Sequence, residues 1–346
     1  MLQGTGDGRA AFPLPPMSSA LHYVSDAEPG LRRQRAGRGF LYRDSQGRVV
    51  KERATLDRIR ALAIPPAYQR VWICADPLGH LQATGFDARG RKQYRYHPDW
   101  SEAQAQAKFE HMAAFARALP LIRAQVAQDL KAPPLSKTHM LATVAQLLDR
   151  TLIRVGNERY AAENRSYGLT TLRKRHIKLN GTQVILDFRA KSGQQRRVSL
   201  RDRRLAAVLR RCQELPGQRL FQYFDEAGEP QPLDSRDVNG YLQAIAGPAV
   251  SAKDYRTWAG TLLAAVHLRQ LDPPPSKRQV AAGVRQAAGM LGNTPAICRA
   301  SYVHPAVVEA HMGGGLAELV ALRGPPREGL SDVESALARF LETLEG

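Results

Sequence analysis

The stretch from Leu291 to Pro305 places a tyrosine among groups that bind phosphate. Tyr302 follows Asn293 and lies close to Arg299 in the chain. A phenol beside such donors is a candidate nucleophile, because amide and guanidinium groups stabilise the charge that develops on a phosphate. The structural alternative is an amphipathic side chain with a buried ring and a solvated hydroxyl. The choice depends on what the rest of the chain supplies.

The composition favours a polyanionic partner. The 346 residues include 50 Lys and Arg against 32 Asp and Glu, which gives a formal net charge of +18. This field favours nucleic acid strongly, a membrane surface weakly and a small acidic metabolite hardly at all. No apolar run approaches the roughly 18 residues that cross a bilayer. We therefore expect a soluble protein that binds nucleic acid.

Neither cysteines nor histidines indicate a metal site. Cys74, Cys212 and Cys298 lie far apart, without the paired spacing of a zinc site or a disulfide framework. His304 and the other histidines lack metal-ligand spacing, so we expect a structural role for them. The cysteine usage fits a reducing cytoplasm, and we expect neither a metal nor a cofactor.

A tyrosine that attacks a phosphodiester needs particular partners. The transition state carries extra negative charge on its nonbridging oxygens, which arginine forks and an amide or imidazole donor can stabilise. The leaving alkoxide needs a proton, which a lysine or arginine can supply. The chain offers such a set in the order Arg154, Lys191, Arg256, Asn293 and Tyr302.

With their neighbours, these residues resemble the type IB DNA topoisomerases, and specifically their short, poxvirus-like bacterial branch. The matching segments include Lys253-Asp-Tyr-Arg256 and Ser301-Tyr-Val-His-Pro305, and the resemblance extends from about residue 19 to 315. It implies an α+β fold of the type IB topoisomerase and tyrosine recombinase type. A small β-rich N-terminal domain would precede a larger, mainly α-helical catalytic domain that carries a short β-hairpin.

The resemblance also implies an activity. Such an enzyme relaxes positive and negative supercoils by cutting one strand of duplex DNA through a 3′-phosphotyrosyl intermediate, followed by strand rotation and religation, without ATP or a required metal. Tyr302 matches its nucleophile, and Arg154 and Arg256 match the two arginines that stabilise the phosphorane. Lys191 matches the general acid for the 5′ oxygen, and nearby Lys253 is a candidate for assisting proton delivery.

Asn293 departs from the viral pattern, which has a histidine at this position. An amide can donate a hydrogen bond to a nonbridging oxygen but cannot be protonated. We therefore expect Asn293 to serve as a phosphate-oxygen donor without the charge of an imidazolium.

Basic residues gather in three clusters. In the cluster at 89–97, an amide and two phenols alternate with cations, and the resemblance makes this segment a DNA contact of the N-terminal domain. The residues expected to touch DNA are Arg91, Lys92, Gln93, Tyr94 and Tyr96, together with Tyr160 as a further backbone contact. The clusters at 32–38 and 173–178 fit either a solvated face or DNA binding.

The local patterns predict the elements that carry these residues. Short runs at 39–43, 71–74 and 81–86, bounded by turn signals, indicate strands of one antiparallel sheet. Ala-rich stretches at 101–119 and 121–130 indicate helices interrupted by Pro120. Ser136 caps a further helix whose apolar positions continue to Val155.

Two more signals lie further along the chain. The segments 183–188 and 196–200 indicate a hairpin with Lys191 at its tip. Ser331 and Glu334 form a capping-box pattern that opens a helix with apolar residues as far as Leu344. We divide the chain into a disordered extension (1–16), an N-terminal DNA-binding domain (17–105) and a catalytic domain (106–346).

Two alternatives stay open. A tyrosine site-specific recombinase would share the chemistry, although it normally shows a His-x-x-Arg motif at Lys253-Asp-Tyr-Arg256. A non-enzymatic duplex DNA-binding protein would use only the basic faces. For the topoisomerase we expect a cytoplasmic monomer at the bacterial nucleoid that closes on duplex DNA as a clamp, with no membrane and no obligate protein partner. The glycines at 313–315 suggest the hypothesis that Tyr302 is displaced before DNA binds.

Overall fold

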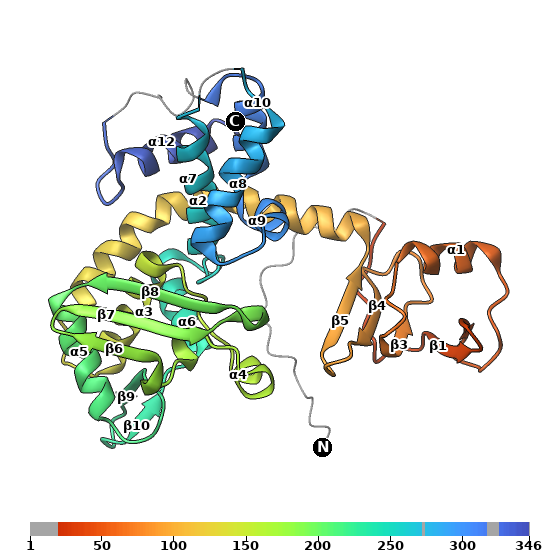
Figure 1. Cartoon of the computed structure of the whole chain (residues 1–346), viewed down its shortest axis with the longest axis horizontal. Helices are drawn as coiled ribbons and strands as arrows, with labels where there is room; N and C mark the ends of the chain where they lie inside the picture. Colours follow the sequence, from red (N-terminus) through yellow and green to blue (C-terminus); the bar gives the residue numbers. More distant parts are fainter. Residues whose placement is uncertain (1–19, 272–273, 317–324, 346) are drawn as a thin grey trace. The chain divides into compact units, whose positions relative to one another are not determined.

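The computed structural model describes residues 20–271, 274–316 and 325–345. The expected extension at 1–16 lies outside these residues. The chain divides into two compact units, an N-terminal one that ends at Lys108 and a C-terminal one from Phe109 onward. Helix α2 (Pro98–Asp129) contributes residues to both units (Figure 1).

The N-terminal unit is built on a five-stranded antiparallel sheet in the order β2-β1-β3-β4-β5. Its elements are β1 (Leu31–Ala36), β2 (Gly39–Arg43), α1 (Arg53–Ala61), β3 (Gln69–Ile73), β4 (Leu81–Phe86) and β5 (Lys92–Tyr96). Ile59 of α1 packs on Leu31, Val71 and Ile73 of the sheet. The three predicted strands and their antiparallel sheet are confirmed.

Strands β1 and β5 were not predicted, and both carry the basic clusters. β1 reads LRRQRA and β5 reads KQYRY, so neither shows the alternation of apolar and polar residues that marks a half-buried strand. They form strands because they pair along the neighbours β3 and β4. Backbone pairing thus specifies these strands where the side-chain pattern does not.

The C-terminal unit is mainly helical and carries a three-stranded antiparallel sheet, β6-β7-β8. Its remaining elements up to the second sheet are α3 (Lys137–Thr151), α4 (Glu158–Asn164), β6 (Ile177–Asn180), β7 (Gln183–Arg189), β8 (Gln195–Arg201) and α5 (Arg203–Glu214). They continue with β9 (Gln222–Phe224), β10 (Pro230–Pro232), α6 (Ser235–Ala246), α7 (Asp254–Leu268), α8 (Lys277–Leu291), α9 (Pro295–Tyr302), α10 (Pro305–Met312) and α12 (Asp332–Glu342). Short 3-10 turns lie at Leu169–Thr171, Lys174–His176 and Lys191–Gly193.

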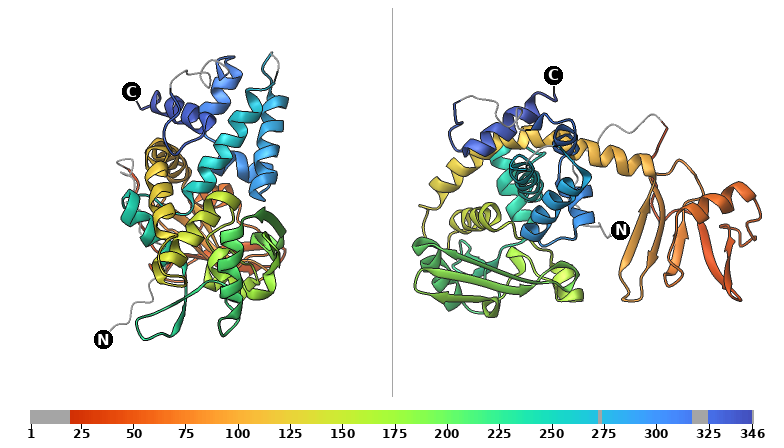
Figure 2. Two further views of the ribbon diagram at one scale, coloured as in Figure 1. Left: turned by 90° about the vertical axis from the view of Figure 1, so that its left-hand side faces the viewer. Right: turned by 45° about the horizontal axis from the view of Figure 1, so that its top comes forward.

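Two groups of elements within this unit hold the segments of interest. Helix α3 lies against one face of the β6-β7-β8 sheet, and helices α7, α8 and α9 pack on one another (Figures 1 and 2). Residues from both groups, such as Leu148, Phe188 and Trp258, belong to one continuous buried core. Each large apolar side chain buried in such a core contributes about 1.5–3 kcal/mol. Among the described residues, no helix is long and apolar enough to cross a membrane.

The predicted interruption at Pro120 is wrong. Helix α2 continues through Pro120 from Pro98 to Asp129. A proline inside a helix removes one backbone hydrogen bond and usually bends or ends it. Here Phe115, Leu119 and Ile122 on both sides of Pro120 are fully buried in the core. Their burial outweighs the cost of one lost hydrogen bond.

The predicted extent of the following helix is also wrong. Ser136 does cap α3, since its hydroxyl accepts the His139 N–H, but α3 ends at Thr151 rather than at Val155. Leu152 adopts a left-handed conformation with φ of 55°. The Thr151 hydroxyl accepts the Ile153 N–H and so replaces the next helical hydrogen bond. As a result Arg154 lies in the segment after the helix.

The two remaining local predictions are confirmed in their main features. β7 and β8 form the predicted hairpin with Lys191 at its tip, and β6 adds a strand that the sequence did not indicate. Ser331 and Glu334 form the predicted capping box of α12. Leu344 is the exception, because it lies beyond the end of α12 and is 49% exposed.

Candidate active site

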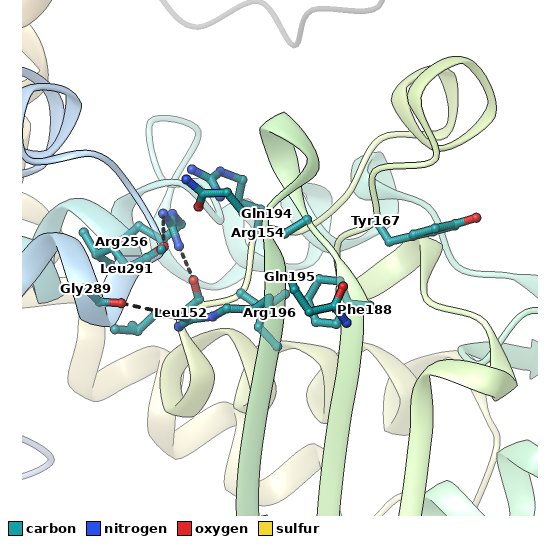
Figure 3. A pocket seen from close by; sticks show the side chains of 13 residues that line it. Leu152, Arg154, Tyr167, Phe188, Gln194, Gln195, Arg196, Arg256, Gly289 and Leu291 are labelled. Carbon is teal, nitrogen blue, oxygen red and sulfur yellow. Dashed lines mark hydrogen bonds between the residues drawn. The ribbon is translucent and has the colours of Figure 1, made fainter.

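Arg256 connects two chain segments that carry other candidate residues. It lies in the first turn of α7 and is 3% exposed. Its Nη1 donates to the Leu152 carbonyl, just after α3, and its Nη2 donates to the Leu291 carbonyl at 2.9 Å (Figure 3). Carbonyls at the end of a helix lack partners within that helix. Arg256 therefore fixes the C-terminal ends of α3 and α8 side by side.

Arg154 and Asn293 follow these two helix ends and meet. Arg154 Nη2 donates to Asn293 Oδ1 at 2.5 Å. The backbone of Arg154 is also held, because its carbonyl accepts the Leu169 N–H at 2.9 Å. The hydrogen bond from Arg154 orients the Asn293 amide, so that the Asn293 NH₂ group remains as a free donor.

Two buried donors at this place have no hydrogen-bond partner in the described part of the chain, namely Asn293 Nδ2 and Arg256 Nε. A buried donor without a partner costs about 1–3 kcal/mol. Buried donors without a partner call for a functional explanation, such as binding a ligand. Phosphate oxygens are acceptors well suited to amide and guanidinium donors.

Tyr302 is the last residue of α9 and lies next to Arg256. The guanidinium carbon of Arg256 is 5.1 Å from the centre of the Tyr302 ring, and Arg256 forms a hydrogen bond with Tyr302. The nucleophile candidate is thus already among the phosphate-binding groups. The hypothesis that Tyr302 is displaced before DNA binds stays a prediction, and in this structure the glycines at 313–315 follow the end of α10.

The backbone of Tyr302 is seated on α7, one turn beyond Arg256. The Thr261 hydroxyl donates to the Tyr302 carbonyl at 3.2 Å and accepts the His304 N–H at 3.0 Å. At Gly260, a Cβ atom would lie 2.9 Å from the Cβ of Tyr302. A glycine is needed here because α7 and the Tyr302 backbone approach each other closely.

The cations around Tyr302 change its ionisation. Burial raises the pKa of Tyr302, but the charges of Arg256 and Arg154, a hydrogen bond from Arg256 and the charge of Lys191 together bring that pKa below its ordinary value. Burial and the neighbouring Arg154 lower the pKa of Arg256 to about 10, so this guanidinium stays protonated at neutral pH. The site therefore favours the phenolate, which is the nucleophilic form.

The two candidate lysines are both exposed. Lys191 lies at the hairpin tip, near enough for its charge to lower the pKa of Tyr302. Lys253 immediately precedes α7, and its carbonyl accepts the Arg256 N–H at 3.1 Å. His304 is structural as expected, since its Nδ1 accepts the Ala306 N–H and caps α10.

A cavity of about 170 Å³ adjoins these groups, and one charged residue in its wall was not predicted from the sequence. Arg154 and Arg256 contribute to its wall together with Arg196 of β8 (Figure 3). Arg196 occupies an inward position of the strand, two residues before Val198. The sequence signal that could have identified Arg196 is an arginine at a strand position whose neighbours on the same face are apolar. Among the described residues, no group of three or more His, Cys, Asp or Glu side chains could hold a metal ion.

The expected DNA contacts in the N-terminal unit lie on β5 and the turn before it, on two faces of the sheet. Tyr94 and Tyr96 share one face, with rings 6.2 Å apart and nearly parallel. Gln93 points to the other face and donates to Asp87 at 3.1 Å. Both cations are in ion pairs, Arg91 with Asp87 at 2.6 Å and Lys92 with Asp26 at 2.6 Å. The rings of Tyr94 and Tyr96 also pack against the buried cluster of Trp72, Cys74 and Leu81.

The other expected contact and the third basic cluster belong to the C-terminal unit. Tyr160 lies on α4 and is 59% exposed. In the cluster at 173–178, Arg173 lies over the Tyr167 ring at 5.7 Å and His176 is buried, so part of this cluster is structural.

Comparison with known proteins gives matches along most of the chain. Residues 97–312 match the family model of the eukaryotic DNA topoisomerase I catalytic core, and residues 39–87 match that of the bacterial DNA topoisomerase IB N-terminal domain. DNA topoisomerase 1B of Acanthamoeba polyphaga mimivirus is 32% identical over 285 residues, which cover 79% of this chain and 85% of the relative. The chain belongs to the type IB DNA topoisomerases.

More distant relatives agree with this assignment. DNA topoisomerase 1B of vaccinia virus is 22% identical over 247 residues, covering 70% of this chain and 75% of the relative. DNA topoisomerase 1 of rabbit fibroma virus is 23% identical over 243 residues, covering 67% and 72%. The expected poxvirus-like family, its α+β fold and its activity are thereby confirmed, and the recombinase and non-enzymatic alternatives are not supported.

The topoisomerase offers a direct test of how Tyr302 is seated. We expect Gly260→Ala to lower the rate of DNA cleavage by about 10²-fold, because the added methyl group displaces the Tyr302 backbone. The measurement is single-turnover cleavage of a duplex oligonucleotide whose downstream strand diffuses away, so that religation is blocked. Gly240→Ala on α6 is the matched control, since a Cβ there meets no atom within 4 Å. Equal rates for the two variants would contradict this role of Gly260.

The pH dependence of cleavage tests the cation cluster. The charge of Arg154 favours the Tyr302 phenolate, so Arg154→Met should raise the pKa of Tyr302. The limb of the rate profile that rises with pH should therefore move to higher pH. Arg150→Met serves as the control, because Arg150 forms a surface ion pair with Asp202. An Arg154→Met profile that is lowered but not displaced would show that Arg154 does not act on the phenol.

Proposed function

We propose that Tyr302 is the nucleophile with which this topoisomerase cleaves one strand of duplex DNA. The Tyr302 oxygen attacks the scissile phosphorus, a bond from that oxygen to phosphorus forms, and the bond from phosphorus to the 5′ oxygen breaks. The products are a 3′-phosphotyrosyl enzyme and a free 5′-hydroxyl. The observation that carries this proposal is the contact of Tyr302 with Arg256, beside the unpartnered Asn293 and Arg256 donors.

Arg154, Arg256 and Asn293 would bind the nonbridging oxygens of the phosphate. Arg256 Nε and Asn293 Nδ2 are unpartnered in the described chain, so neither has to give up a hydrogen bond to bind an oxygen. Each such donor contributes on the order of 3 kcal/mol to transition-state stabilisation. Because fixed guanidinium and amide groups perform this task, the mechanism requires no metal.

Lys191 would donate the proton that the 5′ oxygen takes up as it leaves. Its place at the hairpin tip and its effect on the Tyr302 pKa support this role. Lys253, at the start of α7, would assist by passing a proton toward the site. In religation the steps run backwards, so that the 5′-hydroxyl attacks the phosphotyrosine and Lys191 takes the proton back.

Torsional strain in the DNA would drive relaxation. One phosphate ester replaces another in each direction, so cleavage is nearly thermoneutral and needs no ATP. While the 3′ end is held on Tyr302, the free 5′-hydroxyl end rotates about the intact strand. Supercoils of either sign should therefore relax.

The N-terminal and C-terminal units would form the two halves of a monomeric clamp on duplex DNA. In the first half, Tyr94 and Tyr96 would contact DNA, with Gln93, Arg91 and Lys92 beside them. In the second, exposed Tyr160 would add a backbone contact. The net charge of +18 supports such a surface. A chain of this kind would work in the cytoplasm at the bacterial nucleoid, without a membrane or a protein partner.

Plasmid relaxation tests the proposed function. We expect the enzyme to relax positively and negatively supercoiled plasmid in EDTA without ATP, at concentrations at which sedimentation shows a monomer. A strict requirement for magnesium would contradict a mechanism based on guanidinium and amide donors, and activity that appears only on dimerisation would contradict the monomeric clamp.

A further inference from the structure

The end of the β7-β8 hairpin is exposed and has few contacts. All side chains from Lys191 to Gln195 are exposed, and Ser192 and Gly193 have φ angles of 64° and 78°. The turn is closed by local hydrogen bonds, such as that from the Ala190 N–H to the Gln194 carbonyl at 2.7 Å. These bonds shape the turn but do not locate it relative to other elements.

Arg196 ties this hairpin end to α8. It pairs with Phe188 across the hairpin, so the two side chains share the inward face of the sheet. Positions further along this face are apolar, such as Val198 and Leu200. Arg196 Nη2 donates to the Met290 carbonyl at 2.5 Å. Its Nη1 approaches the Gly289 carbonyl at 3.5 Å (Figure 3).

The partners of Arg196 are well placed to hold a cation. Gly289 and Met290 lie in the last turn of α8, where the helix dipole is negative. The Gly289 carbonyl already accepts the Gly292 N–H at 3.2 Å, whereas the Met290 carbonyl is bound by Arg196 Nη2. The carbonyl of the next residue, Leu291, is also bound by an arginine, in this case Arg256. Gly292 has a φ of 61°, and a Cβ there would lie 3.4 Å from Arg196 Nη1. Arg196 thus fits closely over the turn that leads to Asn293.

The other strand of the hairpin, β7, is held to a neighbouring segment by a backbone hydrogen bond. The Tyr167 N–H donates to the Arg189 carbonyl at 2.9 Å and holds the end of β7. On β8 it is the Arg196 side chain that reaches a neighbouring element. Loss of the Arg196 contact would leave α8 fixed by Arg256, but it would release the β8 side of the hairpin end.

We propose that Arg196 is a positioning residue that latches the hairpin to the end of α8 and thereby places Lys191 at the leaving 5′ oxygen. This inference rests on the proposed function of Lys191 as the general acid. Arg196 need not touch DNA to act in this way. Its effect passes through the turn from Ala190 to Gln194, which carries Lys191.

Two other roles for Arg196 lead to different results. If its charge mainly stabilised the phosphate, its loss would slow cleavage whatever the leaving group. If it served only the stability of the fold, its loss would lower the unfolding temperature without a specific effect on cleavage. A role through Lys191 affects only the protonation of the leaving group.

A sulfur-containing substrate separates these cases. Replacing the bridging 5′ oxygen by sulfur gives a thiolate leaving group, which is a much weaker base than an alkoxide and departs without a proton. We expect Arg196→Met to cleave the ordinary oligonucleotide about 10²-fold more slowly than wild type. On the sulfur substrate it should cleave at close to the wild-type rate. Lys191→Ala should show the same restoration.

Matched variants make the outcomes decisive. Arg201→Met removes an exposed arginine at the far end of β8 and should cleave both substrates like wild type. Arg196→Lys keeps the charge but cannot contact both carbonyls in the same way. It should therefore show a smaller loss of cleavage rate, with the same restoration by sulfur. It also serves as the test variant if thermal unfolding shows that Arg196→Met does not fold.

The results distinguish failure of this inference from failure of the proposed function. If sulfur restores Lys191→Ala but not Arg196→Met, or if the Arg196 variants cleave normally, the latch is wrong while Lys191 remains the acid. If sulfur fails to restore Lys191→Ala itself, the proposed role of Lys191 is wrong, and the inference that depends on it is overturned as well.

Discussion

Replacement of Tyr302 by phenylalanine is expected to abolish the covalent protein–DNA adduct and plasmid relaxation together. The variant lacks the oxygen that would bond to phosphorus, and loss of a covalent nucleophile lowers turnover on the order of 10⁶-fold. The fold should be unaffected, because the Tyr302 ring packs against buried neighbours such as Val303 and retains that contact as phenylalanine. The adduct is measured on denaturing gels with a labelled oligonucleotide.

Binding of duplex DNA should survive this change. Affinity for DNA comes mainly from many contacts between cations and phosphates, none of which requires the Tyr302 hydroxyl. The control is therefore the dissociation constant of Tyr302→Phe for the same duplex at fixed salt, which should lie near that of wild type. An adduct formed by the variant would show that the nucleophile is another residue.

Arg256→Lys is expected to have the second largest effect. A lysine keeps the charge but cannot bind the Leu152 and Leu291 carbonyls while also offering a donor to phosphate. Cleavage should fall about 10²- to 10³-fold, as for removal of an oxyanion donor. Single-turnover cleavage measures this loss.

The same variant should also be less stable. A buried carbonyl left without a partner costs about 1–3 kcal/mol, which denaturant unfolding can detect. Arg204→Lys is the control, because Arg204 is exposed on α5. Normal cleavage by Arg256→Lys would mean that charge alone suffices at this position, and it would contradict the geometry proposed for the site.

Candidate residues that are far apart in the sequence lie together in the structure, but the contacts that hold them in place were not predicted. Tyr302, Arg154 and Arg256 were found because together with their neighbours they resemble a family. Their contacts could not be predicted in the same way. Arg256 binds backbone carbonyls far away in the chain, and any residue type at Leu152 or Leu291 would supply the same carbonyl. Arg196 was missed for this reason too.

Local patterns predicted elements where one face is clearly apolar and failed where another interaction decides. Ser136 and the capping box at Ser331 were readable because side chains satisfy the first N–H groups of the helices. The end of α3 was not, because the Thr151 hydroxyl replaces a backbone acceptor there. Pro120 was misread because burial of its neighbours outweighs a lost hydrogen bond.

The most direct test of the central proposal is to locate the covalent bond. The adduct formed with an oligonucleotide is digested with trypsin and nuclease, and the modified peptide is identified by mass spectrometry. Cleavage after Arg299 and Arg323 gives a peptide of residues 300–323. The chain has 11 tyrosines, and Tyr302 is the only one in this peptide. We expect the nucleotide-derived phosphate on this peptide, at Tyr302. A phosphate attached to any other tyrosine would contradict the proposal.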